Sequence, residues 1–130
     1  MSVLIVEDDP DLGQVWRGHI ESLGHRVELA CDQSAAIRAL QSCDVALILL
    51  DMDLRAGSAL AIADFAGYRH PDLRVLFLTA RPVFTDGSIF RHAPNACGFV
   101  PAGIRPEDLA LMVDHHAARP RPADTNAPGD

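Results

Sequence analysis

Three acidic residues directly follow two of the most apolar segments of the chain. Glu7 and Asp8 come after residues 3–6, and Asp51 comes after residues 45–50. If both segments are strands of one doubly wound parallel sheet, the carboxylates converge beyond the carboxyl ends of the strands, where such sheets bind ligands. Like charges about 4 Å apart repel by about 4 kcal/mol at an effective dielectric constant of about 20. A cluster of this kind therefore needs a cation or a proton.

These residue types suit phosphoryl-transfer chemistry. Carboxylate oxygens in an open site are ligands for Mg²⁺, which keeps several of its waters. A bound metal would neutralise a phosphoryl group next to Asp51, whose carboxylate would attack phosphorus and form an acyl phosphate. Thr79 ends a third apolar segment and offers a hydroxyl to a phosphoryl oxygen. Each acid taken alone is better explained as a solvated loop residue, but three acids with Thr79 favour a site.

Apolar segments alternate with helix-like segments along the chain. Strands are expected at residues 3–6, 26–31, 45–50, 74–79 and 97–101. Helices are expected to begin after the capping residues Asp9, Asp32 and Ser58, and at Pro106. This alternation predicts an α/β fold, a doubly wound five-stranded parallel sheet covered on both faces. The first, third and fourth strands are apolar throughout and are placed at the centre, which gives the order 2-1-3-4-5.

Two details of this prediction rest on finer patterns. The first helix is expected to bury a stripe at helical spacing, formed by Leu12, Val15, Trp16, His19 and Leu23. Residues 81–96 contain two prolines and a glycine, which are unfavourable in a helix. The fourth helix is therefore expected to be short or irregular.

Length and composition set the remaining limits. The 130 residues fit one domain, expected over residues 1–118, followed by a disordered tail over 119–130 that is rich in Pro, Ala, Asp and Gly. A formal charge of -7 argues against nucleic-acid binding. Neither a targeting segment nor a membrane-spanning apolar run is visible, so the cytoplasm is the expected location. All 11 basic residues are Arg, and the chain contains no Lys.

The acidic cluster lies within a larger set of motifs that resembles the response-regulator receiver family. The resemblance covers about residues 2–118 and implies a flavodoxin-like receiver fold. It rests on five segments: residues 4–9 (LIVEDD), 48–54 (ILLDMDL), 76–80 (LFLTA), 98–100 (GFV) and 105–109 (RPEDL). Each motif alone is weak, and their combination is strong.

The resemblance implies a function and a role for each site residue. Asp51 would accept a phosphoryl group from a sensor histidine kinase or histidine phosphotransfer protein, with at most weak self-phosphorylation and self-dephosphorylation rather than enzyme activity. Mg²⁺ would be held by Glu7, Asp8 and Asp51, together with the backbone carbonyl of Asp53. Thr79 and the aromatic Phe99 would form the pair that moves on activation. The expected output is contact with a downstream protein by a stand-alone receiver, with no direct binding to nucleic acid or membrane.

Three departures from the family pattern bear on the switching mechanism. The family's Lys-Pro pair after the fifth strand is replaced by Ala102 and Gly103, so the usual Lys contact with the phosphoryl group is missing. The usual Pro four residues after the acceptor is Arg55, and the region between Ala80 and Phe99 fits the pattern poorly. Arg81, two residues after Thr79, either points at the phosphoryl pocket or is a solvated loop charge, alone or paired with Asp53.

Two alternative functions are left open. The missing Lys favours a pseudo-receiver, an interaction module that never needs phosphate. The Asp51-Met52-Asp53 sequence also resembles the DxD motif of haloacid dehalogenase-type phosphatases. That family usually places the motif on its first strand, with Thr or Val two residues later. Arg55 occupies that later position here, which argues against the phosphatase.

Overall fold

The computed structural model describes residues 2–55, 57–80 and 95–118. The strands are β1 (Ser2–Val6), β2 (Arg26–Ala30), β3 (Leu47–Asp51), β4 (Arg74–Thr79) and β5 (Ala96–Pro101). The helices are α1 (Pro10–Glu21), α2 (Gln33–Ser42), α3 (Ala59–Arg69) and α5 (Pro106–Ala118). The expected short or irregular fourth helix and the expected disordered tail fall on residues outside this description. None of the described helices is both long and apolar enough to cross a membrane.

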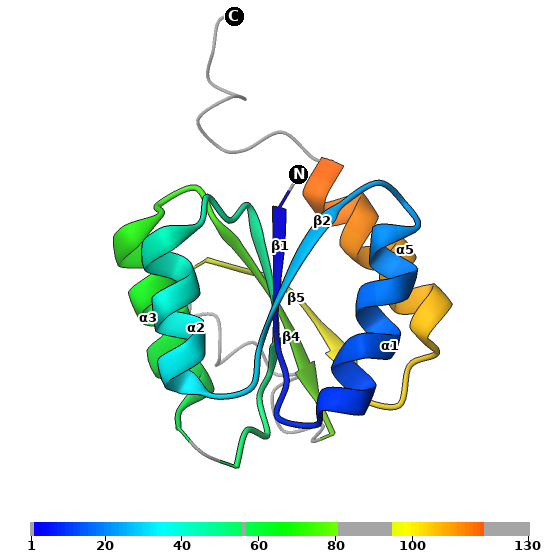
Figure 1. Cartoon of the computed structure of the whole chain (residues 1–130), viewed down its shortest axis with the longest axis horizontal. Helices are drawn as coiled ribbons and strands as arrows, with labels where there is room; N and C mark the ends of the chain where they lie inside the picture. Colours follow the sequence, from blue (N-terminus) through cyan, green and yellow to red (C-terminus); the bar gives the residue numbers. More distant parts are fainter. Residues whose placement is uncertain (1, 56, 81–94, 119–130) are drawn as a thin grey trace, which may run out of the picture.

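The five strands form one parallel sheet in the order β2-β1-β3-β4-β5, which confirms the predicted topology. Helices α1 and α5 cover one face of the sheet, and α2 and α3 cover the other (Figure 1). Alternate residues of a central strand enter the two cores: Leu4 packs with α2 and α3, and Ile5 packs with α1 and α5. Because both faces of the sheet are buried, the central strands are apolar at every position except their ends.

Side-chain caps fix where the helices begin after the strands. The Asp9 carboxylate accepts the backbone N–H groups of Asp11 and Leu12, and Pro10 occupies the first turn of α1. Ser58 caps α3 in the same way by accepting the N–H of Ala61. Each cap satisfies an amide that has no partner within its helix. The caps therefore fix the first turns of α1 and α3, which follow the loops that carry the acidic residues.

The buried face of α1 differs from the predicted stripe. Trp16 is buried as expected, but its buried neighbours are Gly13 and Ile20. Val15 and Leu23, predicted to be buried, are 45% and 40% exposed. The buried line of α1 runs through Gly13, where a Cβ atom would lie at an ordinary contact distance of 3.5 Å from the Leu29 side chain. A glycine contributes no apolar side chain to a periodicity, so the true line of contact was not visible in the sequence.

Candidate functional site

The parallel pairing of β1 and β3 brings the acidic residues together. The register aligns Val6 with Leu50, so the next residues of the two strands, Glu7 and Asp51, lie side by side. One carboxylate oxygen each from Glu7, Asp8 and Asp51 lies within 4.8 Å of the other two. The structure thus brings together the three carboxylates that were predicted to converge.

Backbone amides hold each of the three carboxylates in place. Glu7 is buried and accepts the N–H of Asp9 at 3.0 Å. Asp51 accepts the N–H of Asp53 at 2.8 Å, and Asp8 accepts the N–H of Arg55 at 2.8 Å. Two of these bonds come from the β3–α3 loop. The acidic cluster and this loop therefore fix each other's position.

Burial and mutual repulsion change the acidity of the cluster. Burial raises the pKa of Glu7 to about 8, and the nearby charge of Asp51 contributes to the increase. Burial also raises the pKa of Asp51. The pKa of Asp8 is lowered, mainly because the Arg55 backbone N–H stabilises its charged form. The Glu7–Asp51 pair holds a proton more readily than isolated carboxyls do, and a cation bound at the same place would remove that need.

The donor set of the cluster fits a hard divalent cation. It consists of carboxylate oxygens from three residues, at positions close enough to share one ion. Oxygen-only donors with open coordination positions are what Mg²⁺ requires, whereas zinc sites are usually built with sulfur or nitrogen ligands. The backbone carbonyl of Asp53 remains a predicted fourth ligand.

Thr79 and Asp53 lie on the same edge of the sheet as Asp51. In the register of β3 and β4, Asp51 pairs with Leu78, and Thr79 is the next residue. Thr79 is buried, and its carbonyl accepts the N–H of Ala102 at 3.0 Å. The Asp53 carboxylate accepts the N–H of Ala80 at 3.2 Å. The loop after β3 is thereby connected to the end of β4.

Phe99, the expected switch aromatic, stacks on Phe77. The ring centroids are 5.3 Å apart, and the planes differ by 11°. A register shift between β4 and β5 makes this contact possible, since Val75 pairs with Ala96 but Leu76 pairs with Gly98. Without the shift, Phe77 would face Gly98. Phe99 is therefore half-buried against the core beneath α2 and α3.

A model of the response regulator receiver domain matches residues 3–114 of the chain. The chain belongs to the response regulator receiver domain family. It is the receiver domain of a two-component response regulator, and such domains are generally phosphate acceptors rather than conventional enzymes. Asp51 of the Asp51-Met52-Asp53 sequence ends β3, not the first strand, so the haloacid dehalogenase alternative is set aside.

Solved structures of receiver domains share this fold. The non-phosphorylated HemR receiver domain from Leptospira biflexa is 26% identical, with a TM-score of 0.82 over 93% of this chain and 97% of that chain. A CheY-like receiver protein from Methanospirillum hungatei is 19% identical, with a TM-score of 0.80 over 89% and 92% of the two chains. TrrA from Thermotoga maritima, solved in complex with Mg²⁺-BeF, is 19% identical, with a TM-score of 0.74 over 88% and 96%. The search of curated proteins gave no significant match.

The receiver domain places two of its unusual residues at this site. Ala102 is exposed, directly after β5, with its N–H bonded to Thr79. Arg55 lies against Asp8, and its Nε is 3.7 Å from the Asp8 carboxylate. In the sequence, Arg55 is visible only as a departure from the family pattern, four residues after Asp51. That position was the only indication of a contact with the site. Arg81 lies outside the described residues.

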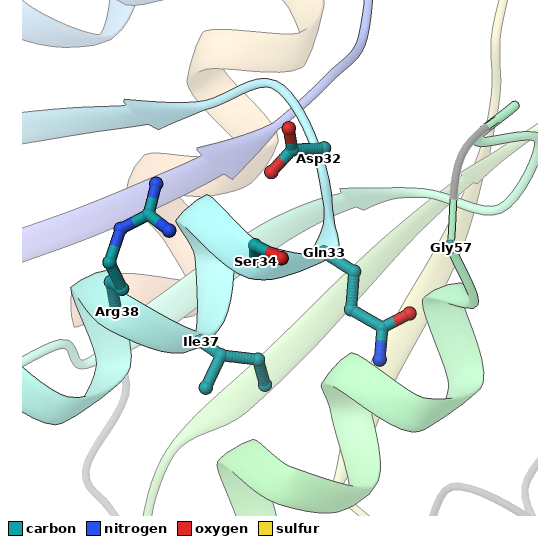
Figure 2. Close-up of a pocket in the computed structure, with 6 residues that line it drawn as sticks. All are labelled: Asp32, Gln33, Ser34, Ile37, Arg38 and Gly57. Atoms are coloured by element: carbon teal, nitrogen blue, oxygen red, sulfur yellow. The ribbon is translucent and has the colours of Figure 1, made fainter.

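A separate cavity of about 600 Å³ lies beside the acidic cluster's loops and contains none of its three carboxylates. Figure 2 shows Gln33 pointing from the start of α2 toward the start of α3. Its Oε1 accepts the N–H of Ser58 at 2.9 Å. Gly57, with φ +104°, allows this approach, because a Cβ there would lie 2.6 Å from that of Gln33. The β3–α3 loop is thus held at both of its ends.

Proposed function

We propose that this receiver domain accepts a phosphoryl group on Asp51 from a histidine kinase or phosphotransfer protein and signals by contact with another protein in the cytoplasm. The supporting observation is the convergence of Glu7, Asp8 and Asp51 within 4.8 Å, at the sheet edge that Thr79 also reaches. The proposal extends to a receiver domain over residues 1–118 that binds neither nucleic acid nor membrane directly.

Asp51 is the nucleophile in the proposed reaction. A carboxylate oxygen of Asp51 forms a bond to phosphorus while the phosphorus–nitrogen bond of a phosphohistidine breaks, and the imidazole leaves with the bonding electrons. The Asp53 N–H holds one Asp51 oxygen at 2.8 Å, which fixes the orientation of the carboxylate. Glu7, Asp8, Asp51 and the Asp53 carbonyl would hold Mg²⁺, which would supply positive charge for the incoming phosphoryl oxygens.

Thr79 and Phe99 carry the response to phosphorylation in this proposal. The Thr79 hydroxyl binds a phosphoryl oxygen, and the movement is passed to β5, whose end is bonded to the Thr79 carbonyl through Ala102. A ligand shifts a conformational equilibrium only by contacts that differ between the two states. One such contact, the family's Lys, is absent at Ala102, so the shift is smaller than is usual in the family.

The residue at position 102 also supports a second candidate, the phosphorylation-independent pseudo-receiver. Both candidates share the fold, and only the first requires Mg²⁺ and a phosphoryl mimic to bind. Calorimetric titration with Mg²⁺, followed by beryllofluoride, separates them. Binding of both ligands in the parent, and its loss in the double variant Glu7→Gln with Asp8→Asn, supports phosphoryl acceptance. Mg²⁺ binding that persists in the double variant contradicts the assigned ligands.

A further inference from the structure

Arg55 brings a positive charge to the edge of the acidic cluster. Its backbone N–H donates to Asp8 Oδ2 at 2.8 Å, and its Nε lies 3.7 Å from the same oxygen. The backbone bond fixes where the side chain starts. The side chain itself is 86% exposed, whereas that of Asp8 is 18% exposed. The guanidinium is therefore tethered at the site and remains free to reorient.

The Arg55 guanidinium has two alternative anionic partners at this site, the Asp8 carboxylate and a phosphoryl group on Asp51. Without a phosphoryl group, its neighbour is the Asp8 carboxylate, one oxygen of which belongs to the predicted Mg²⁺ site. A phosphoryl group on Asp51 would add oxygens and negative charge beside Asp8. Arginine binds phosphate through charge-assisted, bidentate hydrogen bonds, which are stronger than an exposed contact with one carboxylate. The second partner is therefore preferred when it is present.

We propose that Arg55 is the phosphoryl-binding cation of this receiver domain, standing in for the absent Lys, and that in the unphosphorylated domain it competes with Mg²⁺ for Asp8. This inference rests on the proposed function, since it assigns a residue to the same site. It gives the residue that replaces the family's Pro a definite role. The role is one of positioning and charge compensation: Asp51 remains the residue that accepts phosphorus.

The inference predicts effects of opposite sign on two ligands. In Arg55→Ala the backbone N–H to Asp8 is retained and only the guanidinium is lost. Mg²⁺ alone should bind about twofold to fivefold more tightly, because a competing positive charge has gone. Beryllofluoride, added at saturating Mg²⁺, should bind about twofold to fivefold more weakly, because a direct contact has been lost. A general change in folding would move both affinities in the same direction.

The experiment measures both dissociation constants by isothermal titration calorimetry on the full chain. Arg17→Ala is the matched control, because it also removes an exposed arginine that is paired with an acid, Glu21, on α1. Arg55→Lys keeps the charge and loses the bidentate geometry, so it should bind Mg²⁺ like the parent and beryllofluoride with intermediate affinity. If Arg55→Ala does not fold, Arg55→Gln provides the same comparison with a longer side chain.

Opposite shifts in Arg55→Ala, with both constants unchanged in Arg17→Ala, support the inference. Unchanged constants, or two constants that move in the same direction, overturn it while leaving phosphoryl acceptance intact. A loss of beryllofluoride affinity in Arg81→Ala but not in Arg55→Ala assigns the role to Arg81 and likewise overturns it. If the parent binds neither Mg²⁺ nor beryllofluoride, the proposed function fails, and the role of Arg55 fails with it.

Discussion

Glu7 and Asp51 lie side by side at the ends of adjacent parallel strands, each with a carboxylate oxygen within 4.8 Å of the other. Glu7 is buried and Asp51 is half-buried. Loss of solvation raises the pKa of both carboxyls, and the charge of Asp51 raises the pKa of Glu7 further. The stability of this arrangement therefore depends on a group that neutralises the pair. That group is a proton at low pH or a metal ion at high pH.

Stability of the metal-free domain should fall as pH rises. The pKa of Glu7 is raised from 4.5 in the unfolded chain to about 8 in the fold, so the folded state binds more protons between these values. The free energy of unfolding should decline from about pH 4.5 to about pH 8 and then level off. Chemical denaturation in a chelator across this range measures the decline.

The same series with Glu7→Gln is the control for this pH dependence. Glutamine cannot ionise, so the decline should become shallower, leaving the part due to Asp51. Saturating Mg²⁺ should stabilise the parent more at pH 8 than at pH 5. A pH profile that does not change in Glu7→Gln would show that this carboxyl is not responsible.

Restoring the missing cation at position 102 should strengthen the response to a phosphoryl mimic. Ala102 is exposed and joined to Thr79 by a 3.0 Å hydrogen bond, so Ala102→Lys places an ammonium at the end of β5 without disturbing the core. Amide chemical shifts of β5 should change more on beryllofluoride binding than in the parent. Ala102→Gln is the control for side-chain length, and an equal response in it would argue against a charge effect.

The stacked pair of Phe77 and Phe99 should contribute measurably to stability. Phe99→Ala removes a half-buried ring and its stacking contact, which together should cost about 1–3 kcal/mol of unfolding free energy. Tyr68→Ala is the control, because Tyr68 is 86% exposed and its loss should cost no more than about 0.5 kcal/mol. Urea denaturation tests both. Equal costs in the two variants would mean that the stacking does not stabilise the fold.

A side chain at Gly57 should destabilise the β3–α3 loop. Gly57 has φ +104°, and an added Cβ would lie 2.6 Å from the Gln33 Cβ, which cannot move without its backbone. Gly57→Ala should therefore cost about 1–3 kcal/mol. Gly103→Ala meets no atom within 4 Å and should be close to neutral. Thermal unfolding of the two variants provides the comparison, and a neutral Gly57→Ala would contradict the conformational argument.

The fold and the acidic cluster were predictable because both follow from apolar patterning. Strands buried on both faces, such as β1 and β3, are apolar along their buried length. The acids at their carboxyl ends share one edge in any parallel register that keeps the core buried. The Phe77–Phe99 contact was not predictable, since it needs an extra residue in β5 that shifts the register after Val75. Alternation of residue types does not reveal such a shift.

The contact between Arg55 and Asp8 also could not be predicted from the sequence. It depends on the path of the β3–α3 loop, which is set by the left-handed conformation of Gly57 and by the bond from Ser58 to Gln33. Loop residues carry no periodicity from which such a path follows. The exposure of Val15 has a related cause, because the buried line of α1 runs through Gly13, which adds no apolar side chain to the helical periodicity.

The most direct test of the central claim is to locate the phosphoryl group after incubation with Mg²⁺ and acetyl phosphate. Mass spectrometry of the intact chain and of its peptides should find one acid-stable, base-labile adduct, on Asp51. Asp53→Asn, the nearby control, should still be labelled, and Asp51→Asn should not. Labelling that persists in Asp51→Asn, or a parent chain that takes up no phosphoryl group under conditions in which Mg²⁺ binds, would contradict the account.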